Sequence, residues 1–456
     1  MIEEKWRAVR NVLLVRLDNL GDVLLTTPAF HAVKTSLPDA RLTLLASPVG
    51  AQVAALDPDI DEVIVYQAPW MDPWHRLPQD GEREQAMISL LKERQFDAAL
   101  IFTSFRQSSL PAAYLCYLAG IPLRAAASID GPGSLLTTRH KHPEDMMHEV
   151  ERGLDLVNAL GMQTDEDDLV LRVPGDAMLA ISTLLADLNI DGRPLVVVHP
   201  GCSMPARTYS WEQYAQVIDL LVEQLAAFVI VTGMKEERPL VAQVLERVKA
   251  ENRPATLALV GVLPFAEFCA MIKAADLTIT NNTGPMHISA AVKTPVIALF
   301  ALTNPPEQWG PWHVPHRQLY HDVPCRICYS RVCPYQHDCL RLVSPHKVIN
   351  AAVDLLCVSQ AGQAQGPHTT QPGPLPLPLH PAEIVPAAGQ AQGPHATQPV
   401  PLPLPLPLTE SYPATNPSER DSQSWTEVVG ARGGDDAGKG PCACPAGWAK
   451  NEEVVG

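Results

Sequence analysis

The stretch Arg16-Leu17-Asp18-Asn19-Leu20-Gly21-Asp22 decides the fold. It follows a short apolar run, Asn11 to Val15, and precedes Val23 to Lys34, where apolar residues recur at roughly helical spacing. A strand, a turn and a helix in this order are typical of a Rossmann-like domain, which binds its ligand at the carboxyl end of the strand. Gly21 lets the backbone approach a ligand, and Asp22 projects from the helix start. A carboxylate there caps the helix or acts as a base, and the turn alone favours capping.

Composition narrows the class of protein. The chain has 456 residues, a net charge of −16 and ten cysteines. The length predicts two to three domains, and the acidic balance argues against nucleic-acid binding, which needs a basic face. The sequence contains no apolar run of about 18 residues and no secretory signal at its N-terminus. We therefore expect a cytoplasmic protein with reduced thiols, and peripheral membrane contact stays open.

Strands and helices alternate over two regions, residues 1–175 and 176–358. In the first region, strands are predicted at Asn11–Arg16, Arg41–Ala46, Glu62–Tyr66, Ala98–Phe102 and Arg124–Ala127. In the second region, they are predicted at residues 194–198, 228–232, 257–260, 277–280 and 295–300. Helical patterns separate them, so the fold class is α/β with mostly parallel sheets. Two Rossmann-like halves in one chain predict a ligand site in the cleft between them.

The composition changes from residue 359 onward. Residues 361–368 and 388–395 are near-copies, and each leads into alternating proline and leucine. Such a segment cannot form a packed core, so residues 359–456 are predicted to be disordered or polyproline II. It is either a docking arm for a proline-recognising partner or a dispensable extension.

Two loops of the second region have the features of anion sites. The first contains His199-Pro200-Gly201-Cys202-Ser203 and leads to Arg207, before a predicted helix. A small loop with free N–H groups suits a phosphate, and Arg207 is either its charge partner or a solvated surface cation.

The other loop is Asn281-Asn282-Thr283-Gly284-Pro285-Met286-His287. Its proline, Pro285, suits the first position of a helix. Thr283 and nearby backbone amides can hold an anion, whereas His287 either faces the cleft or is structural.

Four cysteines, Cys325, Cys328, Cys333 and Cys339, lie within fifteen residues. Their number fits a structural metal site, but their spacing matches neither a standard zinc ribbon nor the plant-type iron–sulfur order. Buried structural thiols, a local disulfide and a structural zinc or cluster are all left open.

In their order and spacing, several motifs of residues 11 to about 355 resemble glycosyltransferase family 9, the lipopolysaccharide heptosyltransferases and their relatives. They are residues 16–28, His199-Pro200-Gly201, residues 282–291, Trp309-Gly310-Pro311 and the cysteine cluster ending Cys339-Leu340.

The resemblance implies the GT-B architecture, with an acceptor-binding N-terminal domain and a C-terminal domain for a nucleotide sugar, typically ADP-heptose. It implies an inverting reaction without a metal or other cofactor, with Asp22 as the base. The donor- and phosphate-binding candidates are Gly21, Ser203, Arg207, Asn282, Thr283, Gly284 and His287.

The expected function is therefore transfer of a sugar from a nucleotide diphosphate to a lipid-linked or other cell-envelope glycan. One alternative is a nucleotide-sugar epimerase of the same fold. The other is a non-catalytic sugar-binding scaffold whose tail recruits partners, although a pure binding module has no need of a base at Asp22.

Overall fold

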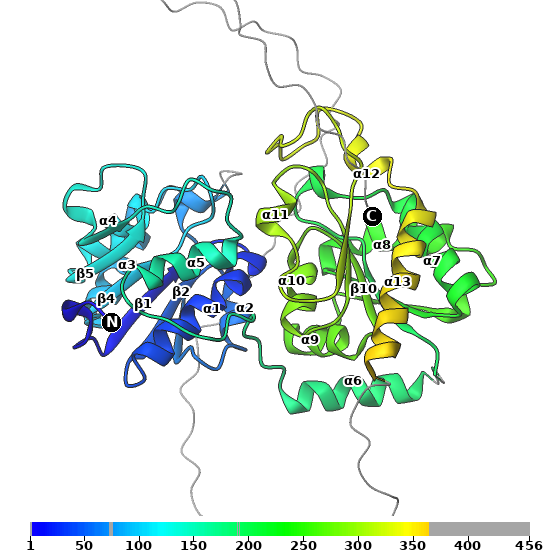
Figure 1. The fold of residues 1–456 in the computed structure, drawn as a ribbon, viewed down its shortest axis with the longest axis horizontal. Helices are drawn as coiled ribbons and strands as arrows, with labels where there is room; N and C mark the ends of the chain where they lie inside the picture. The colour runs from blue at the N-terminus through cyan, green and yellow to red at the C-terminus, as the bar shows by residue number, and fades with distance from the viewer. Residues whose placement is uncertain (1, 73–75, 189, 191, 364–456) are drawn as a thin grey trace, which may run out of the picture. The chain divides into compact units, whose positions relative to one another are not determined.

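A computed structural model of the protein describes residues 2–72, 76–188, 190 and 192–363. The predicted tail lies outside these residues from position 364 onward. The described chain builds two lobes, each with a six-stranded sheet and flanking helices (Figure 1). No described helix has both the length and the apolar character that a membrane span requires.

The N-terminal lobe contains the elements β1 to α5, coloured blue to cyan-green in Figure 1. Its strands are β1 (Asn11–Arg16), β2 (Arg41–Ala46), β3 (Glu62–Val65), β4 (Ala98–Ile101), β5 (Leu123–Ala127) and β6 (Thr138–His140). Its α-helices are α1 (Leu20–Ser36), α2 (Gly50–Ala54), α3 (Gly81–Glu93), α4 (Leu110–Leu118) and α5 (Glu149–Asn158).

The C-terminal lobe contains the elements α6 to α13. Its strands are β7 (Leu195–His199), β8 (Phe228–Gly233), β9 (Thr256–Val260), β10 (Leu277–Asn281), β11 (Val296–Leu299) and β12 (His316–Leu319). Its α-helices are α6 (Gly175–Asp187), α7 (Trp211–Leu225), α8 (Arg238–Arg247), α9 (Phe265–Ala274), α10 (Gly284–Ala291), α11 (Pro306–Trp309), α12 (Asp338–Arg341) and α13 (Pro345–Gln363).

Both sheets have the same topology. The strand order is β3-β2-β1-β4-β5-β6 in the first sheet and β12-β11-β10-β7-β8-β9 in the second, and every pair is parallel. Counted within each lobe, this is the Rossmann order, in which the chain reverses direction across the sheet between its first and fourth strands. A ligand crevice is therefore expected at the carboxyl ends of β1 and β4, and of β7 and β10. We call these two places the switch points.

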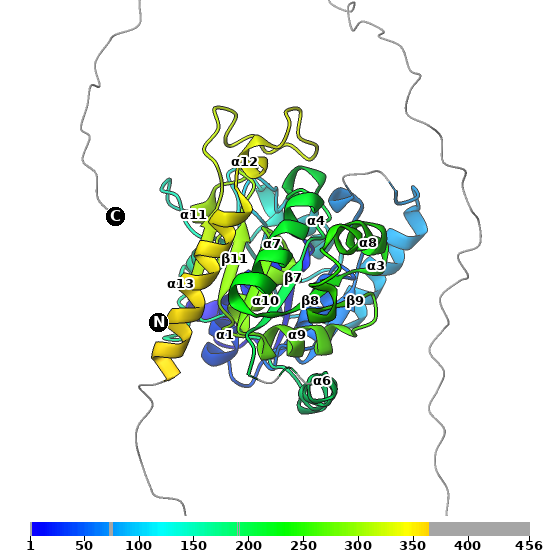
Figure 2. The same ribbon diagram turned by 90° about the vertical axis from the view of Figure 1, so that its right-hand side faces the viewer.

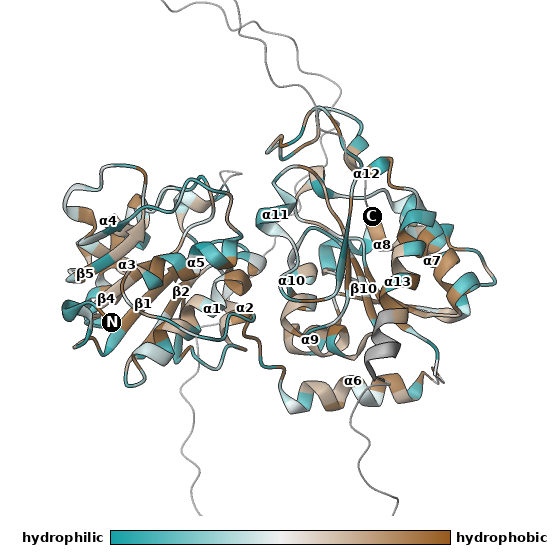
Figure 3. Ribbon diagram, viewed as in Figure 1, coloured by the Kyte–Doolittle hydropathy of each residue, from teal (hydrophilic) through white to brown (hydrophobic). Residues whose placement is uncertain are grey.

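The strands are apolar on both faces because helices cover both faces (Figure 3). Val12 and Leu14 of β1 face the core formed with α1 and α5, whereas Leu13 and Val15 face α3 and α4. All four side chains are almost completely buried, and each such burial stabilises the fold by roughly 1.5–3 kcal/mol. In the C-terminal lobe, α7 and α13 pack together on one face of the sheet (Figure 2), and α6 packs on α9 of the other face.

The edge strands β6 and β12 were absent from the sequence prediction. Thr138–His140 and His316–Leu319 are short and mostly polar, and they are only partly buried. A strand at the edge of a sheet needs no two-sided apolar run, so these segments carry no local signal. Helix α13 was also missed, and it extends to Gln363, beyond residue 358 where the second region was predicted to end.

The two lobes contact each other through the helices that follow β1 and β10. Helix α1 packs against α10, and one apolar core cluster includes residues of both lobes. The acidic stretch Asp165-Glu166-Asp167-Asp168 lies between the last helix of the first lobe and α6. It is held to the C-terminal lobe, because Asp168 pairs with Lys293 at 2.5 Å and the Trp312 indole donates to the Asp167 carbonyl at 2.8 Å. The contact between α1 and α10 brings the two switch points toward each other.

Candidate active site

The turn after β1 fixes Asp22 in the first turn of α1. The Asn19 backbone N–H donates to Asp22 Oδ2 at 3.1 Å, so the predicted capping role is confirmed. The other oxygen, Oδ1, accepts a hydrogen bond from the Ser104 hydroxyl at 2.9 Å. The Asp22 side chain keeps an exposed fraction of 14%. Capping therefore holds the carboxylate in place without withdrawing it from the surface.

Arg16, the last residue of β1, is a buried cation shared by three carboxylates. Its guanidinium lies 3.4 Å from Asp18 Oδ2, 3.5 Å from Asp22 Oδ1 and 3.9 Å from Glu149 Oε2. The same guanidinium donates to the Ser104 hydroxyl at 3.0 Å. Asp18 and Glu149 are themselves buried. Two buried carboxylates and the partly exposed Asp22 share this arginine, so the cluster has an excess of negative charge.

That excess charge changes the acidity of the cluster. Burial and the neighbouring Asp18 charge raise the pKa of Asp22, and they outweigh Arg16, the Ser104 hydroxyl and the Asn19 N–H, which lower it. Burial also raises the pKa of Glu149. A carboxylate with a raised pKa is a stronger base in its ionised form, so the geometry suits Asp22 to proton abstraction.

Arg207 faces this cluster from the C-terminal lobe. It ends a short 3₁₀ turn, Pro205–Arg207, and its Nε donates to the Thr303 hydroxyl at 3.0 Å. Burial lowers the pKa of Arg207, and the nearby Asp22 charge is among the influences that oppose this shift. The guanidinium is therefore a desolvated, anchored cation and not a solvated surface charge. Ser203, in the same loop, is exposed.

The loop after β10 begins α10 at the second switch point. Thr283 is the N-cap of α10, and Gly284 and Pro285 are its first residues. Asn282 is buried, where its amide donates to Asn304 Oδ1 at 3.2 Å and its carbonyl accepts from the Ala301 N–H at 3.1 Å. Asn282 thus ties this loop to the end of β11, and the helix N-terminus provides the free N–H groups.

His287 is placed at the contact between the lobes. A Cβ added to Gly21 would lie 2.5 Å from His287 Cδ2, so only glycine permits this approach. Burial lowers the pKa of His287 to about 3, helped by the positive charge of His148 and Arg207, so the imidazole is neutral. Among the described residues, its Nδ1 belongs to the buried nitrogen atoms without a hydrogen-bond partner. Gly21 therefore adjoins the other lobe directly.

Further contacts link the cluster around Arg16 to the Trp309-Gly310-Pro311 segment and its neighbours. Gln308 donates to Glu149 Oε1 at 2.6 Å, and the His148 imidazole is 3.0 Å from the Gly310 carbonyl. The His148 ring also stacks on Trp312 with 4.6 Å between centroids. These side chains connect α5 of one lobe to the segment after β11 of the other.

Sequence reasoning missed Ser104, Glu149, Thr303 and Gln308 as members of the site. Ser104 follows the predicted strand 98–102, so its place beside the first switch point could have been inferred from the topology. Glu149, Thr303 and Gln308 carry no such signal, because they join the site only through the packing of α5 and of the segment after β11.

The four clustered cysteines are all free thiols with intermediate exposure. Their proximity is reflected in the pKa of Cys339. Burial raises this pKa most, and the charges of the nearby Cys333, Cys325 and Cys328 raise it further. Within the described chain, however, no three of their sulfurs form a group with mutual distances within 4.8 Å. The structure therefore contains no disulfide in this cluster, and its geometry does not assemble a metal-ligand set.

Two Rossmann-like lobes, with the carboxylate of Asp22 at the switch point of one and Arg207 in the loop after the first strand of the other, have the GT-B architecture. The chain belongs to glycosyltransferase family 9 (heptosyltransferase), whose family model matches residues 85–338. It is therefore a glycosyltransferase.

Individual relatives agree with this assignment. The chain is 25% identical over 341 residues to lipooligosaccharide heptosyltransferase 2 of Campylobacter jejuni, covering 74% of this chain and 95% of that protein. The fold is similar to a family 9 glycosyltransferase from Veillonella parvula, with a TM-score of 0.65, 19% identity and coverage of 76% and 98%. It is also similar to the ADP-heptose LPS heptosyltransferase II of Escherichia coli, with a TM-score of 0.62, 20% identity and coverage of 77% and 99%.

Proposed function

We propose that this protein transfers a heptose-like sugar from ADP-heptose, or a related nucleotide sugar, to a hydroxyl of a lipopolysaccharide or other cell-envelope glycan. Residues 1–175 take the acceptor in this proposal, and residues 176–358 hold the donor. Because such an acceptor is lipid-linked, the proposal includes peripheral contact with the cytoplasmic face of a membrane.

The observation that carries the proposal is the position of Asp22 and Arg207 at the two switch points, on opposite lobes, where the Asp22 charge acts on the pKa of Arg207. Asp22 removes the proton of the acceptor hydroxyl, and that oxygen attacks the anomeric carbon from the face opposite the diphosphate. The new bond from carbon to the acceptor oxygen forms as the bond to the phosphate oxygen breaks, so the electron pair leaves with the diphosphate. The configuration at the anomeric carbon is therefore inverted.

The departing diphosphate needs positive charge at the second switch point. The Arg207 guanidinium is anchored by its hydrogen bond to the Thr303 hydroxyl. Burial removes part of its hydration, so its charge is weakly screened. The N-terminus of α10, at Thr283 and Gly284, adds N–H groups and the positive end of the helix dipole. Both groups stabilise the charge that develops on the leaving group.

The names of the relatives support the choice of sugar. The similar Campylobacter jejuni protein is a lipooligosaccharide heptosyltransferase, and the similar Escherichia coli structure is an ADP-heptose LPS heptosyltransferase. At this level of identity, the donor and the acceptor require a direct test.

A donor panel tests the proposal in two steps. Thermal shift of the full chain with ADP, UDP and GDP sugars identifies the donor, since a ligand that binds only the folded state raises the Tm by mass action. The selected donor is then incubated with lipid-linked oligosaccharide acceptors, and the products are analysed by mass spectrometry. We expect ADP-heptose to give the largest shift and a product one heptose heavier.

An arm without acceptor separates the proposal from the epimerase alternative. A transferase leaves the donor almost intact there, whereas an epimerase converts the sugar. Conversion of the donor without acceptor, or transfer of a sugar from UDP or GDP only, contradicts the proposal.

A further inference from the structure

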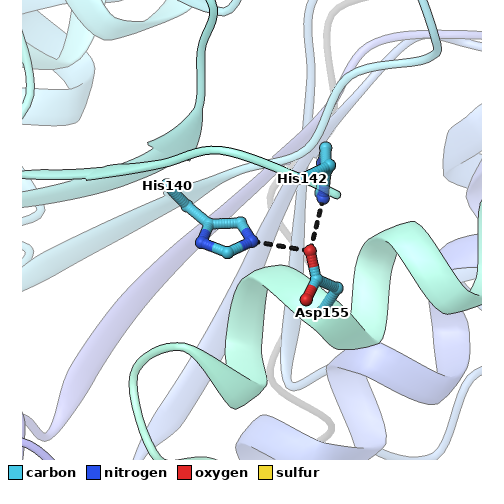
Figure 4. A group of neighbouring side chains, drawn as sticks. All are labelled: His140, His142 and Asp155. Carbon is cyan, nitrogen blue, oxygen red and sulfur yellow. Dashed lines mark hydrogen bonds and ion pairs between the residues drawn. The ribbon is translucent and has the colours of Figure 1, made fainter. Parts of the chain in front are cut away.

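A second group of titratable side chains lies at β6, an edge strand of the same sheet, and borders the cluster around Arg16. His140 is the last residue of β6, His142 follows two positions later, and Asp155 is on α5. His140 Nε2 is 2.6 Å from Asp155 Oδ2, and His142 Nδ1 is 2.7 Å from the same oxygen. Figure 4 shows both imidazoles pointing at that one atom.

The spacing of the residues explains why they converge. Side chains two positions apart on an extended chain point to the same side, so both imidazoles project toward α5. The two rings are nearly perpendicular, with an interplanar angle of 85° and 5.2 Å between centroids. One ligand atom from each of the three residues lies within 4.8 Å of the other two.

We propose that His140, His142 and Asp155 bind a divalent cation of the zinc class, which cross-links β6 to α5. Two imidazole nitrogens and one carboxylate oxygen suit Zn²⁺, Co²⁺ or Ni²⁺ better than Mg²⁺ or Ca²⁺, which prefer oxygen ligands. A fourth position is left for water. The ligand atoms are at hydrogen-bond distances, so entry of a tetrahedral ion requires them to separate by about 0.6 Å.

The surroundings are compatible with such an ion. The three side chains have exposed fractions of 18%, 12% and 25%, so the site is sheltered yet reachable. His142 also borders a small polar pocket together with Arg16, Glu149 and Arg152. Two cations, Arg16 and Arg152, therefore lie nearby, and Glu149, at 3.9 Å from the first and 3.2 Å from the second, offsets part of their charge.

The cation would have a structural role. Strand β6 has three residues and, within the described chain, its one strand partner is β5. Side-chain hydrogen bonds from Lys5 to Thr138 and from Arg139 to the Ser128 carbonyl add to this pairing, and an ion would tie the strand to α5 as well. Helix α5 begins at Glu149, which contacts both Arg16 and Gln308. Fixing α5 to β6 therefore fixes the helix that contributes Glu149 to the cluster around Arg16. The ion takes no part in the proposed transfer, so this inference stands independently of the proposed function.

The test is Co²⁺ binding to the chelator-treated full chain, followed by calorimetry and visible absorption. We expect one equivalent that gives weak d–d bands without the intense thiolate charge-transfer band of cysteine ligation, and a higher Tm with Zn²⁺. Asp155→Asn keeps the shape of the side chain, and it and His142→Ala are each expected to abolish this equivalent. His313→Ala is the matched control, because His313 belongs to an exposed group with Asp167 and Asp168, where Lys293 already occupies Asp168.

Three results overturn the inference. One is the absence of any bound Co²⁺ or Zn²⁺, which means that the group is a hydrogen-bonded cluster only. The second is binding that Asp155→Asn and His142→Ala leave unchanged. The third is binding with a thiolate charge-transfer band alone, which assigns the ion to the cysteines. Circular dichroism of each variant establishes that it is folded before binding is measured.

Discussion

The two switch points occupy the same place in two sheets of identical strand order, yet their chemistry is opposite. The first gathers three carboxylates, Asp18, Asp22 and Glu149, around the buried Arg16. The second presents Arg207 and the glycine-containing start of α10. The shared topology provides a crevice at each place, and the side chains decide whether the crevice holds a base or an anion.

The two switch points also differ in how far their polar groups are already engaged in hydrogen bonds. The acidic switch point holds its base in a network of hydrogen bonds from Ser104 and the Asn19 N–H. The cationic one has an exposed Ser203 and a buried imidazole nitrogen on His287 that finds no hydrogen-bond partner in the described part of the chain. The first is thus pre-organised within its own lobe, whereas the second retains groups that a ligand can engage.

The largest effect is expected from Asp22→Asn, which removes the base and keeps the shape. The rate of transfer should fall by about 10²–10⁴-fold, the typical contribution of general base catalysis. Donor affinity, measured by calorimetry, should stay close to that of the unchanged protein, because the donor is assigned to the other lobe.

Asp61→Asn is the control for that substitution, since Asp61 pairs with Lys34 away from the switch points. A fully active Asp22→Asn enzyme would show that Asp22 is not the base. The proposed chemical contrast between the lobes would then fail.

Arg207→Ala tests the cationic switch point. Loss of one desolvated, charge-assisted contact should weaken binding of the nucleoside diphosphate by about 1.5–3 kcal/mol, or about 10- to 150-fold in Kd. Arg207→Lys should recover part of this, because it restores the charge but not the planar fork. Calorimetry with ADP measures both, and Arg317→Ala on the exposed β12 serves as the control. Unchanged affinity would show that the diphosphate is held elsewhere.

Gly21→Ala tests the contact between the switch points. Helix propensity alone predicts a stabilisation of about 0.5–1 kcal/mol, because alanine is favoured in a helix. The new methyl instead meets His287, so we expect kcat/KM to fall by about 5- to 30-fold, corresponding to about 1–2 kcal/mol of overpacking. Gly81→Ala, where a Cβ meets nothing, is the control.

His287→Ala in the same chain removes the clash that Gly21→Ala creates. The double variant should therefore lose less activity than the two single losses combined. Strict additivity would contradict direct contact between these residues.

The smallest effect is a displacement of the pH profile by Asp18→Asn. The Asp18 charge raises the pKa of Asp22, so its removal lowers that pKa. The base is active when deprotonated, and hence the acid limb of kcat/KM should move to lower pH. Asp97→Asn, at the opposite end of β1, should leave the limb in place. A limb that does not move for Asp18→Asn would mean that the Asp18 charge does not act on Asp22.

Much of the fold was predictable because its signals are local. The central strands β1 and β7 contain continuous apolar runs, which buried parallel strands favour, and β2 and β10 have only threonine between their buried apolar residues. The edge strands β3 and β9 were predicted because they are mostly apolar, whereas the edge strands β6 and β12 are mostly polar and are held by pairing with a neighbouring strand.

The sequence by itself determined the strand–turn–helix that presents Asp22 and the two loops that contain Arg207 and His287, since short-range backbone preferences form those turns. Only the tertiary structure decided what these residues face. Three contacts join segments that are distant in the sequence. Glu149 lies beside Arg16, His287 approaches Gly21, and His140 and His142 converge on Asp155. The energies of burial and charge that tune Asp22 arise only when packing removes water from those contacts.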